Sequence, residues 1–442
     1  MTRHSRTLLL AASIACVSLA PVASAQASPA MPVPSVFVSA AGSDLGPCTR
    51  KAPCASLQRA YRAARPGHVV QVAGGSYGPQ LITRDLSKRS SKHVTFRPAP
   101  KERVVLDGLQ LGAGFHPEKG PKHLTIRGMR LSFASSTDQR PWLALEGTKD
   151  VRMIGIDAGS FYVRGVSDFR ILGGDYGPCV TQQSDGRTTT ACGANSKIDG
   201  PGTSSRVTID GALFHDYMRG TSCDEPGNDC HLECLYVNAS SNVTIRNSRF
   251  QKCGLFNIFF TISGTSAGHR KLLVENNWFD RPYIGTDVAP VQRRETAVML
   301  AWCSTAAGTG YQDVVFRFNS FGPGSGIAWD GDTHPACRYD RVRVYGNILS
   351  QRSCSKQVVY AYNVVTGRAC GGGDRVVASL PYVSASPLGA GGEFRLPKTR
   401  RTVADALVPR SMGCPARDID GKVRPKGKAC TAGSHERVRA TR

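Results

Sequence analysis

Short runs in which apolar and polar residues alternate recur through the middle of the chain, and each is followed closely by Gly or Asn. An alternation with a period of two is typical of a β-strand that buries one face. The runs begin at Leu124, Val151, Phe169, Val207, Val243, Leu273, Val315, Val342 and Val359. Their recurrence indicates one structural unit that is repeated with insertions of variable length.

A single run is too short to bury its apolar face alone, so the units are expected to stack in parallel around a shared core. Gly and Asn tolerate the left-handed backbone of a sharp corner, and aligned Asn side chains can form hydrogen bonds along the stack. The prediction is an all-β fold, a right-handed single-stranded parallel β-helix (a solenoid) of about ten coils over residues 69–383. An antiparallel sandwich or propeller is the alternative, but it would leave more Asn-Gly and Asp-Gly turns.

The N-terminal flank of the repeat has a different pattern. Residues 36–39 indicate a strand, and residues 56–64 indicate a short amphipathic helix that would cap the solenoid within a segment spanning 26–68. A Gly42-Ser43-Asp44 turn lies between them, and a Gly75-Ser76-Tyr77 turn follows. This order of elements resembles the N-terminal part of secreted proteins in the pectate-lyase-like β-helix superfamily.

The C-terminal segment, residues 384–442, carries a second resemblance. Asp418-Ile-Asp-Gly421, Arg424-Pro425 and 433–436 resemble a closing motif frequent in the same proteins, although Ser434-His435 stand where a small residue and an aromatic are usual. The basic residues 422–442 are expected to be disordered or lightly held by a disulfide. The superfamily includes pectate and alginate lyases, polygalacturonases and uronan epimerases. The chain lacks the polygalacturonase signatures and shows no clear pectate-lyase motif, so the resemblance transfers no catalytic residue.

The first 25 residues have the pattern of a secretory signal peptide. Arg3 and Arg6 precede an apolar run over 8–20, and Ala23-Ser-Ala25 forms a small-residue cleavage site. A membrane anchor and lipidation at Cys16 are the alternatives. We expect a secreted, extracellular protein without a transmembrane segment after cleavage, because no later stretch has 18 consecutive apolar residues.

Cysteine usage agrees with export. The chain has 15 cysteines, and 14 remain when Cys16 is removed with the leader. An even number in an oxidising compartment favours disulfides. Short separations suggest the local pairs Cys48–Cys54, Cys179–Cys192 and Cys414–Cys430. The alternative for Cys223, Cys230, Cys234 and Cys253 is a zinc site.

The charge of the chain indicates its class of partner. With 56 Lys and Arg against 33 Asp and Glu, the formal net charge is +23. Such a charge favours an acidic polysaccharide or an anionic cell surface. Nucleic acid is disfavoured, because the chain has an export signal and no basic-aromatic motif.

One cluster of ionisable residues is the main candidate for chemistry. If residues 229–236 form a strand, Asp229, His231 and Glu233 share its outer face, opposite Cys230 and Cys234. Two carboxylates with a histidine between them could act as acid and base on a glycosidic bond, or bind a metal. The alternative is a solvated polar face.

Two further segments are candidates for substrate binding. Trp329, Asp330, Asp332 and His334 combine an aromatic platform with polar groups suited to a sugar. The arginines Arg293 and Arg294 could neutralise a uronate carboxylate. A Gly-Asp surface loop and a salt-bridged loop, respectively, are the alternatives.

These patterns lead to two functional hypotheses. The first is a lyase or hydrolase that acts on an acidic, uronate-containing polysaccharide, in which Ca²⁺ or an arginine neutralises the substrate carboxylate. The second is a non-catalytic β-helix that binds glycan or cell envelope. No other cofactor is indicated.

Overall fold

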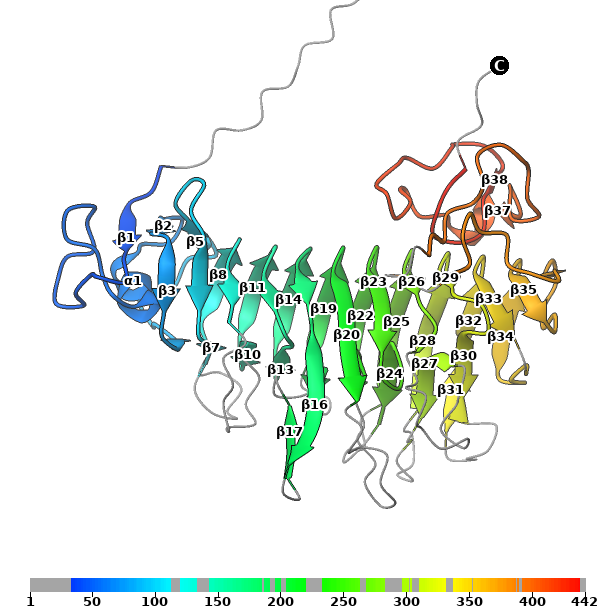
Figure 1. Ribbon diagram of the computed structural model, residues 1–442, viewed down its shortest axis with the longest axis horizontal. Helices are drawn as coiled ribbons and strands as arrows, with labels where there is room; N and C mark the ends of the chain where they lie inside the picture. The colour runs from blue at the N-terminus through cyan, green and yellow to red at the C-terminus, as the bar shows by residue number, and fades with distance from the viewer. Residues whose placement is uncertain are drawn as a thin grey trace, which may run out of the picture. The chain divides into compact units, whose positions relative to one another are not determined.

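The alternating runs form strands that are paired in parallel from one repeat to the next. The computed structural model describes residues 33–437 except 113–119, 133–142, 185–186, 191–194, 200–203, 220–232, 263–267, 283–295, 302, 304–309, 331–336, 352, 387 and 389–391. Residues 34–442 form one compact unit. Apart from one two-stranded sheet near the C-terminus, its strands belong to three sheets that are visited in turn (Figure 1).

Sheet 1 has 13 strands and contains most of the runs recognised in the sequence. Its strands are β1 (Val36–Val38), β2 (Val69–Val72), β5 (Val94–Pro98), β8 (Lys122–Arg127), β11 (Lys149–Ile154), β14 (Ser167–Leu172), β19 (Ser205–Asp210), β22 (Ser241–Arg246), β25 (His269–Glu275), β28 (Gly310–Arg317), β31 (Arg338–Asp340), β32 (Val342–Tyr345) and β34 (Val358–Ala361). All neighbours in this sheet are parallel.

Sheet 2 has 14 strands, including an antiparallel hairpin of β16 and β17. Its strands are β3 (Gly75–Tyr77), β6 (Val104–Leu106), β9 (Arg130–Leu131), β12 (Asp157–Ala158), β15 (Asp175–Tyr176), β16 (Cys179–Ser184), β17 (Arg187–Thr190), β20 (Leu213–Arg219), β23 (Arg249–Cys253), β26 (Trp278–Phe279), β29 (Ser320–Phe321), β33 (Ile348–Gln351), β35 (Val364–Gly367) and β36 (Arg375–Val376).

Sheet 3 has nine strands, each of which lies along the chain between a sheet 2 strand and the next sheet 1 strand. They are β4 (Gln80–Ile82), β7 (Leu109–Leu111), β10 (Leu143–Glu146), β13 (Tyr162–Arg164), β18 (Ser196–Asp199), β21 (Leu235–Asn238), β24 (Ile258–Thr261), β27 (Thr296–Ala301) and β30 (Gly326–Trp329). A chain that visits three parallel sheets in turn is a parallel β-helix, as the repeat predicted. The described residues contain no helix long and apolar enough to cross a bilayer.

In-register pairing builds the core. Leu124, Val151 and Phe169 are paired across β8, β11 and β14, and all three are fully buried. On sheet 2, five aromatic rings stack with neighbouring centroids 4.8–5.3 Å apart. These rings belong to Tyr176, Phe214, Phe250, Phe279 and Phe321. Each buried apolar side chain of this size contributes about 1.5–3 kcal/mol, which explains why the repeat needs stacking.

From β8 onward, the corner after the sheet 1 strands has a left-handed backbone. The corner residue is Gly or Asn at 128, 155, 173, 211, 247 and 276, with φ between 53° and 75°, as the sequence predicted. In the later coils the corner residue is instead Phe318, Gly346 or Tyr362, and the Asn follows it. Those Asn side chains form the expected ladder, in which Asn277, Asn319, Asn347 and Asn363 are linked by amide–amide hydrogen bonds of 3.0–3.1 Å.

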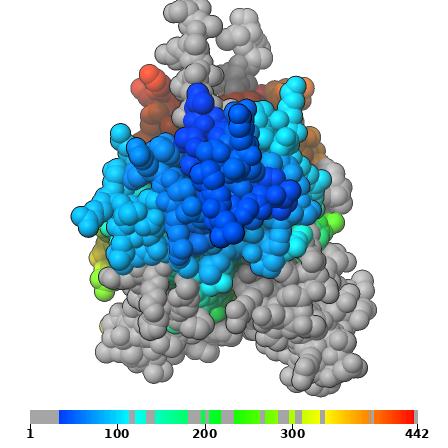
Figure 2. Space-filling view, turned by 90° about the vertical axis from the view of Figure 1, so that its left-hand side faces the viewer, coloured from blue at the N-terminus to red at the C-terminus, as the bar shows by residue number. Residues whose placement is uncertain are grey.

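A short helix lies near the N-terminal end of this unit. Helix α1 (Leu57–Ala63) begins after Ser56, whose hydroxyl accepts a hydrogen bond from the Arg59 N–H. It buries Leu57, Ala60 and Tyr61 and contacts β1 and β4. Figure 2 shows this end of the unit, where the N-terminal residues occupy the centre of the face. Strand β1 pairs with β2, so the first strand of the expected N-terminal segment belongs to sheet 1.

Five disulfides link described cysteines. They are Cys48–Cys54, Cys234–Cys253, Cys303–Cys337, Cys354–Cys370 and Cys414–Cys430. The first and last are pairs that the sequence suggested. Cys179 is also disulfide-bonded, whereas Cys192, its expected partner, lies outside the described residues. The bond between Cys234 and Cys253 removes two of the four ligands proposed for zinc; Cys223 and Cys230 lie outside the described residues.

The basic C-terminal segment is packed rather than loose, which corrects the expectation for residues 422–442 as far as residue 437. Strands β37 (Val408–Pro409) and β38 (Ala429–Cys430) pair there, and a short 3₁₀ helix, η4 (Arg410–Met412), follows β37. Arg424 is 1% exposed, and Ser434 and Glu436 are also buried. A basic composition does not prevent packing here, because Arg424 forms a buried ion pair with Glu436 at 2.8 Å.

Candidate functional site

The predicted row at 229–233 is not an exposed strand where the structure describes it. Strand β21 begins at Leu235, and the side chain of Glu233 is fully buried. Asn195 Nδ2 donates to Glu233 Oε2 at 2.6 Å, and the Glu233 N–H donates to Asn195 Oδ1 at 3.1 Å. The placement of Glu233 on the outer face was therefore wrong. Asp229 and His231 lie outside the described residues.

The predicted aromatic platform is a core side chain. Trp329 is 6% exposed, and its ring packs edge-on against Phe316 and Tyr339, with centroids 6.1 and 5.5 Å away. It cannot stack on a sugar in this position. Asp330 is partly buried beside it. Asp332, His334, Arg293 and Arg294 lie outside the described residues.

The structure instead brings ionisable groups together on the outer side of sheet 2. Asp157 on β12 is paired in register with Asp175 on β15, and β15 is paired with β20, which carries His215. We name this group the sheet 2 row and define it as Asp157, Asp175, His215, Asp216 and Lys252. The residue of β20 in register with Asp175 is Leu213, and His215 lies two positions further along that strand, on the same face.

Contacts within the sheet 2 row centre on the histidine. His215 Nδ1 lies 2.6 Å from Asp216 Oδ2, within hydrogen-bonding geometry. His215 Nε2 lies 2.8 Å from Asp175 Oδ1. Lys252 Nζ lies 3.1 Å from Asp216 Oδ1. Asp216 therefore contacts both His215 and Lys252, whereas Asp175 contacts His215.

The electrostatic surroundings shift the pKa values of Asp157 and Asp216 in opposite directions. Partial burial and the neighbouring charge of Asp175 raise the pKa of Asp157 above its usual value. For Asp216, burial acts in the same direction, but hydrogen bonds from His215 and Lys252 outweigh it and lower the pKa. Carboxylates whose environments push their pKa values apart are suited to different roles in acid–base chemistry.

Sequence reasoning missed this row. None of its five residues is among the candidates that the sequence offered. The sequence does indicate that Asp157 and Asp175 occupy equivalent positions, because each follows a Gly corner, Gly155 or Gly173, by two residues. Only the pairing of β12 with β15 shows that they are neighbours in space.

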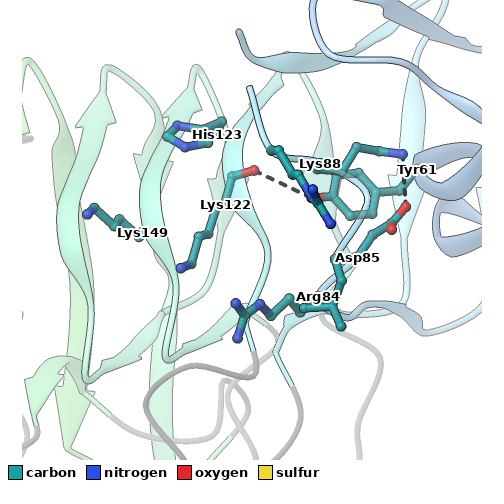
Figure 3. Close-up of a pocket in the computed structure, with 9 residues that line it drawn as sticks. Tyr61, Arg84, Asp85, Lys88, Lys122, His123 and Lys149 are labelled. Carbon is teal, nitrogen blue, oxygen red and sulfur yellow. Dashed lines mark hydrogen bonds and ion pairs between the residues drawn. The ribbon is translucent and has the colours of Figure 1, made fainter. Parts of the chain in front are cut away.

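A second candidate is a pocket beside α1, with a cavity of about 320 Å³ (Figure 3). Lys122 and Lys149 come from adjacent strands β8 and β11, and the segment 84–89 forms the facing wall. Five of its lining residues are cations and one is an acid, a net charge of five minus one, or +4. The cations are Arg84, Lys88, Arg89, Lys122 and Lys149. We name this cavity the basic pocket.

The single acid of the basic pocket is already paired. Asp85 Oδ2 lies 2.8 Å from Lys88 Nζ, which also sits 5.4 Å from the centroid of the Tyr61 ring. Burial and the charge of Asp85 raise the pKa of Tyr61 to about 12, so its hydroxyl stays protonated and donates to the Lys122 carbonyl at 3.4 Å. The pocket thus offers a positive surface with a neutral phenol, a setting that favours anionic ligands.

Comparison with family models and with curated proteins found no match. Among solved structures, the chain is similar to PfbA, a surface adhesin of Streptococcus pneumoniae, at 14% identity and a TM-score of 0.45, covering 69% of this chain and 78% of the adhesin. It is similar to pectate lyase Pel9A at 12% identity and a TM-score of 0.42, covering 91% and 96%. It is similar to the catalytic unit of a GH87 α-1,3-glucanase from Streptomyces thermodiastaticus at 14% identity and a TM-score of 0.40, covering 78% and 66%. Values this low assign neither a family nor an activity.

Proposed function

We propose that this protein is a secreted carbohydrate-active β-helix protein that cleaves an acidic, uronate-containing polysaccharide as a lyase or a hydrolase. The observation that carries the proposal is the sheet 2 row, in which carboxylates and a histidine from successive coils share one outer face. The signal-peptide pattern of residues 1–25 and the disulfides support export. In this proposal α1 is the N-terminal cap of the β-helix.

The chemistry assigns a separate role to each part of the row. Asp157, with its raised pKa, is the general acid that protonates the leaving glycosidic oxygen. Asp175, paired in register with Asp157 on the neighbouring strand, is the carboxylate that acts as base or nucleophile. His215 and Lys252 hold Asp216 ionised beside them, which keeps one fixed charge next to the reacting groups.

Activity is tested with purified mature protein on a panel of acidic polysaccharides. We expect the wild type to release reducing ends from one of them, and unsaturated uronate absorbance distinguishes a lyase from a hydrolase. Asp157→Asn is expected to lower kcat by about 100-fold or more, because it removes a general acid without changing side-chain size. Assays with Ca²⁺ and with chelator are run in parallel, since carboxylate oxygens are the ligands that Ca²⁺ prefers.

The matched control is Asp168→Asn on β14. Asp168 is also an aspartate on the outer side of a sheet, but it is paired with Arg206 and lies outside the row. Its left-handed φ of 58° suits Asn as well as Asp. We expect this control to keep wild-type activity. Equal activity in Asp157→Asn and the wild type would reject the catalytic role of the row.

A second candidate function is glycan binding without cleavage, and the basic pocket favours it. The double variant Lys122→Gln/Lys149→Gln is expected to weaken binding to an anionic glycan by about tenfold at low salt, because each contact contributes up to about 1 kcal/mol. Higher salt should reduce the difference. The control Lys356→Gln/Lys426→Gln removes the same charge at exposed sites elsewhere. Binding without cleavage would be favoured if the wild type retained the glycan without releasing product and only the Lys122→Gln/Lys149→Gln variant lost that binding.

A further inference from the structure

Two histidines and an aspartate converge on three neighbouring strands of sheet 1, beside the basic pocket and outside the sheet 2 row. His93 immediately precedes β5, His123 lies in β8 and Asp150 in β11. Each stands just before one of the paired residues Val94, Leu124 and Val151, so the three occupy equivalent positions in successive coils. His93 Nε2 lies 2.9 Å and His123 Nδ1 lies 2.8 Å from the same atom, Asp150 Oδ2.

In later coils of sheet 1, the residues at the equivalent positions make different contacts. The equivalent residues Asp168 and Arg206 form a bidentate ion pair with N–O distances of 2.6 and 2.9 Å. Asp313 and Arg341 form another, with distances of 2.6 and 3.0 Å. In those coils an arginine satisfies the aspartate directly. Asp150 instead faces two imidazole nitrogens, with its neighbour Arg152 Nη2 4.0 Å from the other oxygen.

The orientation of His93 is fixed by a further contact. Its Nδ1 lies 2.8 Å from the hydroxyl oxygen of Thr125 on β8, which leaves Nε2 directed at Asp150. Metal-binding histidines are held in this way by a hydrogen bond to the nitrogen that does not bind the ion. The rings of His93 and His123 are 6.1 Å apart with an interplanar angle of 64°, so they approach Asp150 from different directions.

We propose that His93, His123 and Asp150 form a binding site for a divalent transition-metal ion, with Zn²⁺ as the best fit. Two imidazole nitrogens and one carboxylate oxygen are a ligand set for zinc rather than for Ca²⁺, which takes oxygen ligands. Around a tetrahedral zinc with bonds near 2.0–2.1 Å, ligand atoms are about 3.3 Å apart. The observed distances need to widen by only about half an ångström to admit the ion.

The surroundings allow an ion to enter and limit its affinity. The side chains of His93, His123 and Asp150 are 13%, 21% and 25% exposed, so water can reach them and provide a fourth ligand. His123 also lines the basic pocket, where the positive charges of Lys122 and Lys149 repel a bound cation and so lower its affinity. Among the described residues, a second group whose three ligand atoms all lie within 4.8 Å of one another contains Asp418, Asp420 and His435. There Arg395 already forms hydrogen bonds of 2.7 Å to both oxygens of Asp420.

The test is a zinc titration of the chelator-treated full-length mature protein by calorimetry, with Co²⁺ absorption as an independent report of tetrahedral nitrogen–oxygen ligation. We expect one ion to bind with the loss of protons that accompanies histidine ligation. His93→Gln and His123→Asn are each expected to lower the affinity at least tenfold. Asn is chosen at residue 123 because φ there is 53°. Asp150→Asn changes the carboxylate ligand in place of a histidine, and circular dichroism verifies that this variant is folded.

The control is His215→Gln, which removes a histidine from the other carboxylate cluster, on sheet 2. It should bind zinc as the wild type does. A wild type that binds no zinc, or a His93→Gln/His123→Asn double variant with undiminished affinity, would overturn the proposal. Because binding is measured without any polysaccharide, its outcome is independent of whether the protein cleaves glycans.

Discussion

Replacing Arg424 with methionine is expected to lower the free energy of unfolding by about 3–5 kcal/mol, the cost of breaking a buried ion pair by removing one partner. Arg424 is 1% exposed, and its Nη1 donates to Glu436 Oε2 at 2.8 Å and to the Thr431 carbonyl at 3.0 Å. Its Nη2 donates to the Gly433 carbonyl and to Asn276 Oδ1, at 2.8 and 3.0 Å.

These contacts attach the C-terminal segment to the β-helix. Asn276 is a corner residue of the coil that contains β25, and the Arg424 guanidinium carbon lies 4.9 Å from the centroid of Phe318, another corner residue. Methionine retains much of the side-chain volume but leaves Glu436 as an uncompensated buried charge. The double variant Arg424→Met/Glu436→Gln should therefore be less destabilised than Arg424→Met alone.

The measurement is urea unfolding at fixed salt with the disulfides intact. Lys422→Met is the control, because it removes the same charge two residues before Arg424 in the sequence. The Lys422 side chain is 46% exposed, and its Nζ lies 4.0 Å from Asp420 Oδ2. Its loss should remain below about 1 kcal/mol. Similar losses in the two variants would mean that the net charge of the segment, rather than the buried pair, determines stability.

Replacing Asn319 with leucine is expected to lower the free energy of unfolding by about 2–6 kcal/mol. Asn319 is fully buried in the asparagine ladder, where Oδ1 accepts from the Asn277 N–H at 3.0 Å and Nδ2 donates to the Val274 carbonyl at 2.9 Å. Leucine is similar in size but leaves that N–H and that carbonyl without partners. Each unsatisfied buried group costs about 1–3 kcal/mol.

Gln312→Leu on β28 is the matched amide-to-leucine control. The Gln312 amide makes one exposed hydrogen bond, to Asp340 at 3.1 Å, so its loss should cost about 1 kcal/mol or less. Thermal and urea unfolding of both variants measure the difference. An Asn319→Leu protein as stable as the control would show that the ladder is not a source of stability.

The sequence alone determined the repeat, because strand alternation and corner residues are local properties. Val151 and Phe169 could be recognised as inward-facing from their own neighbours, and Gly155 and Gly173 as corners from the need for a left-handed backbone. The sequence also indicated the two short disulfides, since small loops bring cysteines close. It could not distinguish Asn276, a corner, from Asn319, a ladder residue one position later in its coil.

Only the tertiary structure decided where the chemistry-bearing side chains lie. Glu233 is buried against Asn195, 38 residues away, and Trp329 is a core residue because Phe316 and Tyr339 surround it. Insertions of variable length separate the coils, so spacing along the chain does not reveal which residues become neighbours. Asp157 and Asp175, or His93, His123 and Asp150, come together through the register of parallel strands, which stacking of the whole core determines.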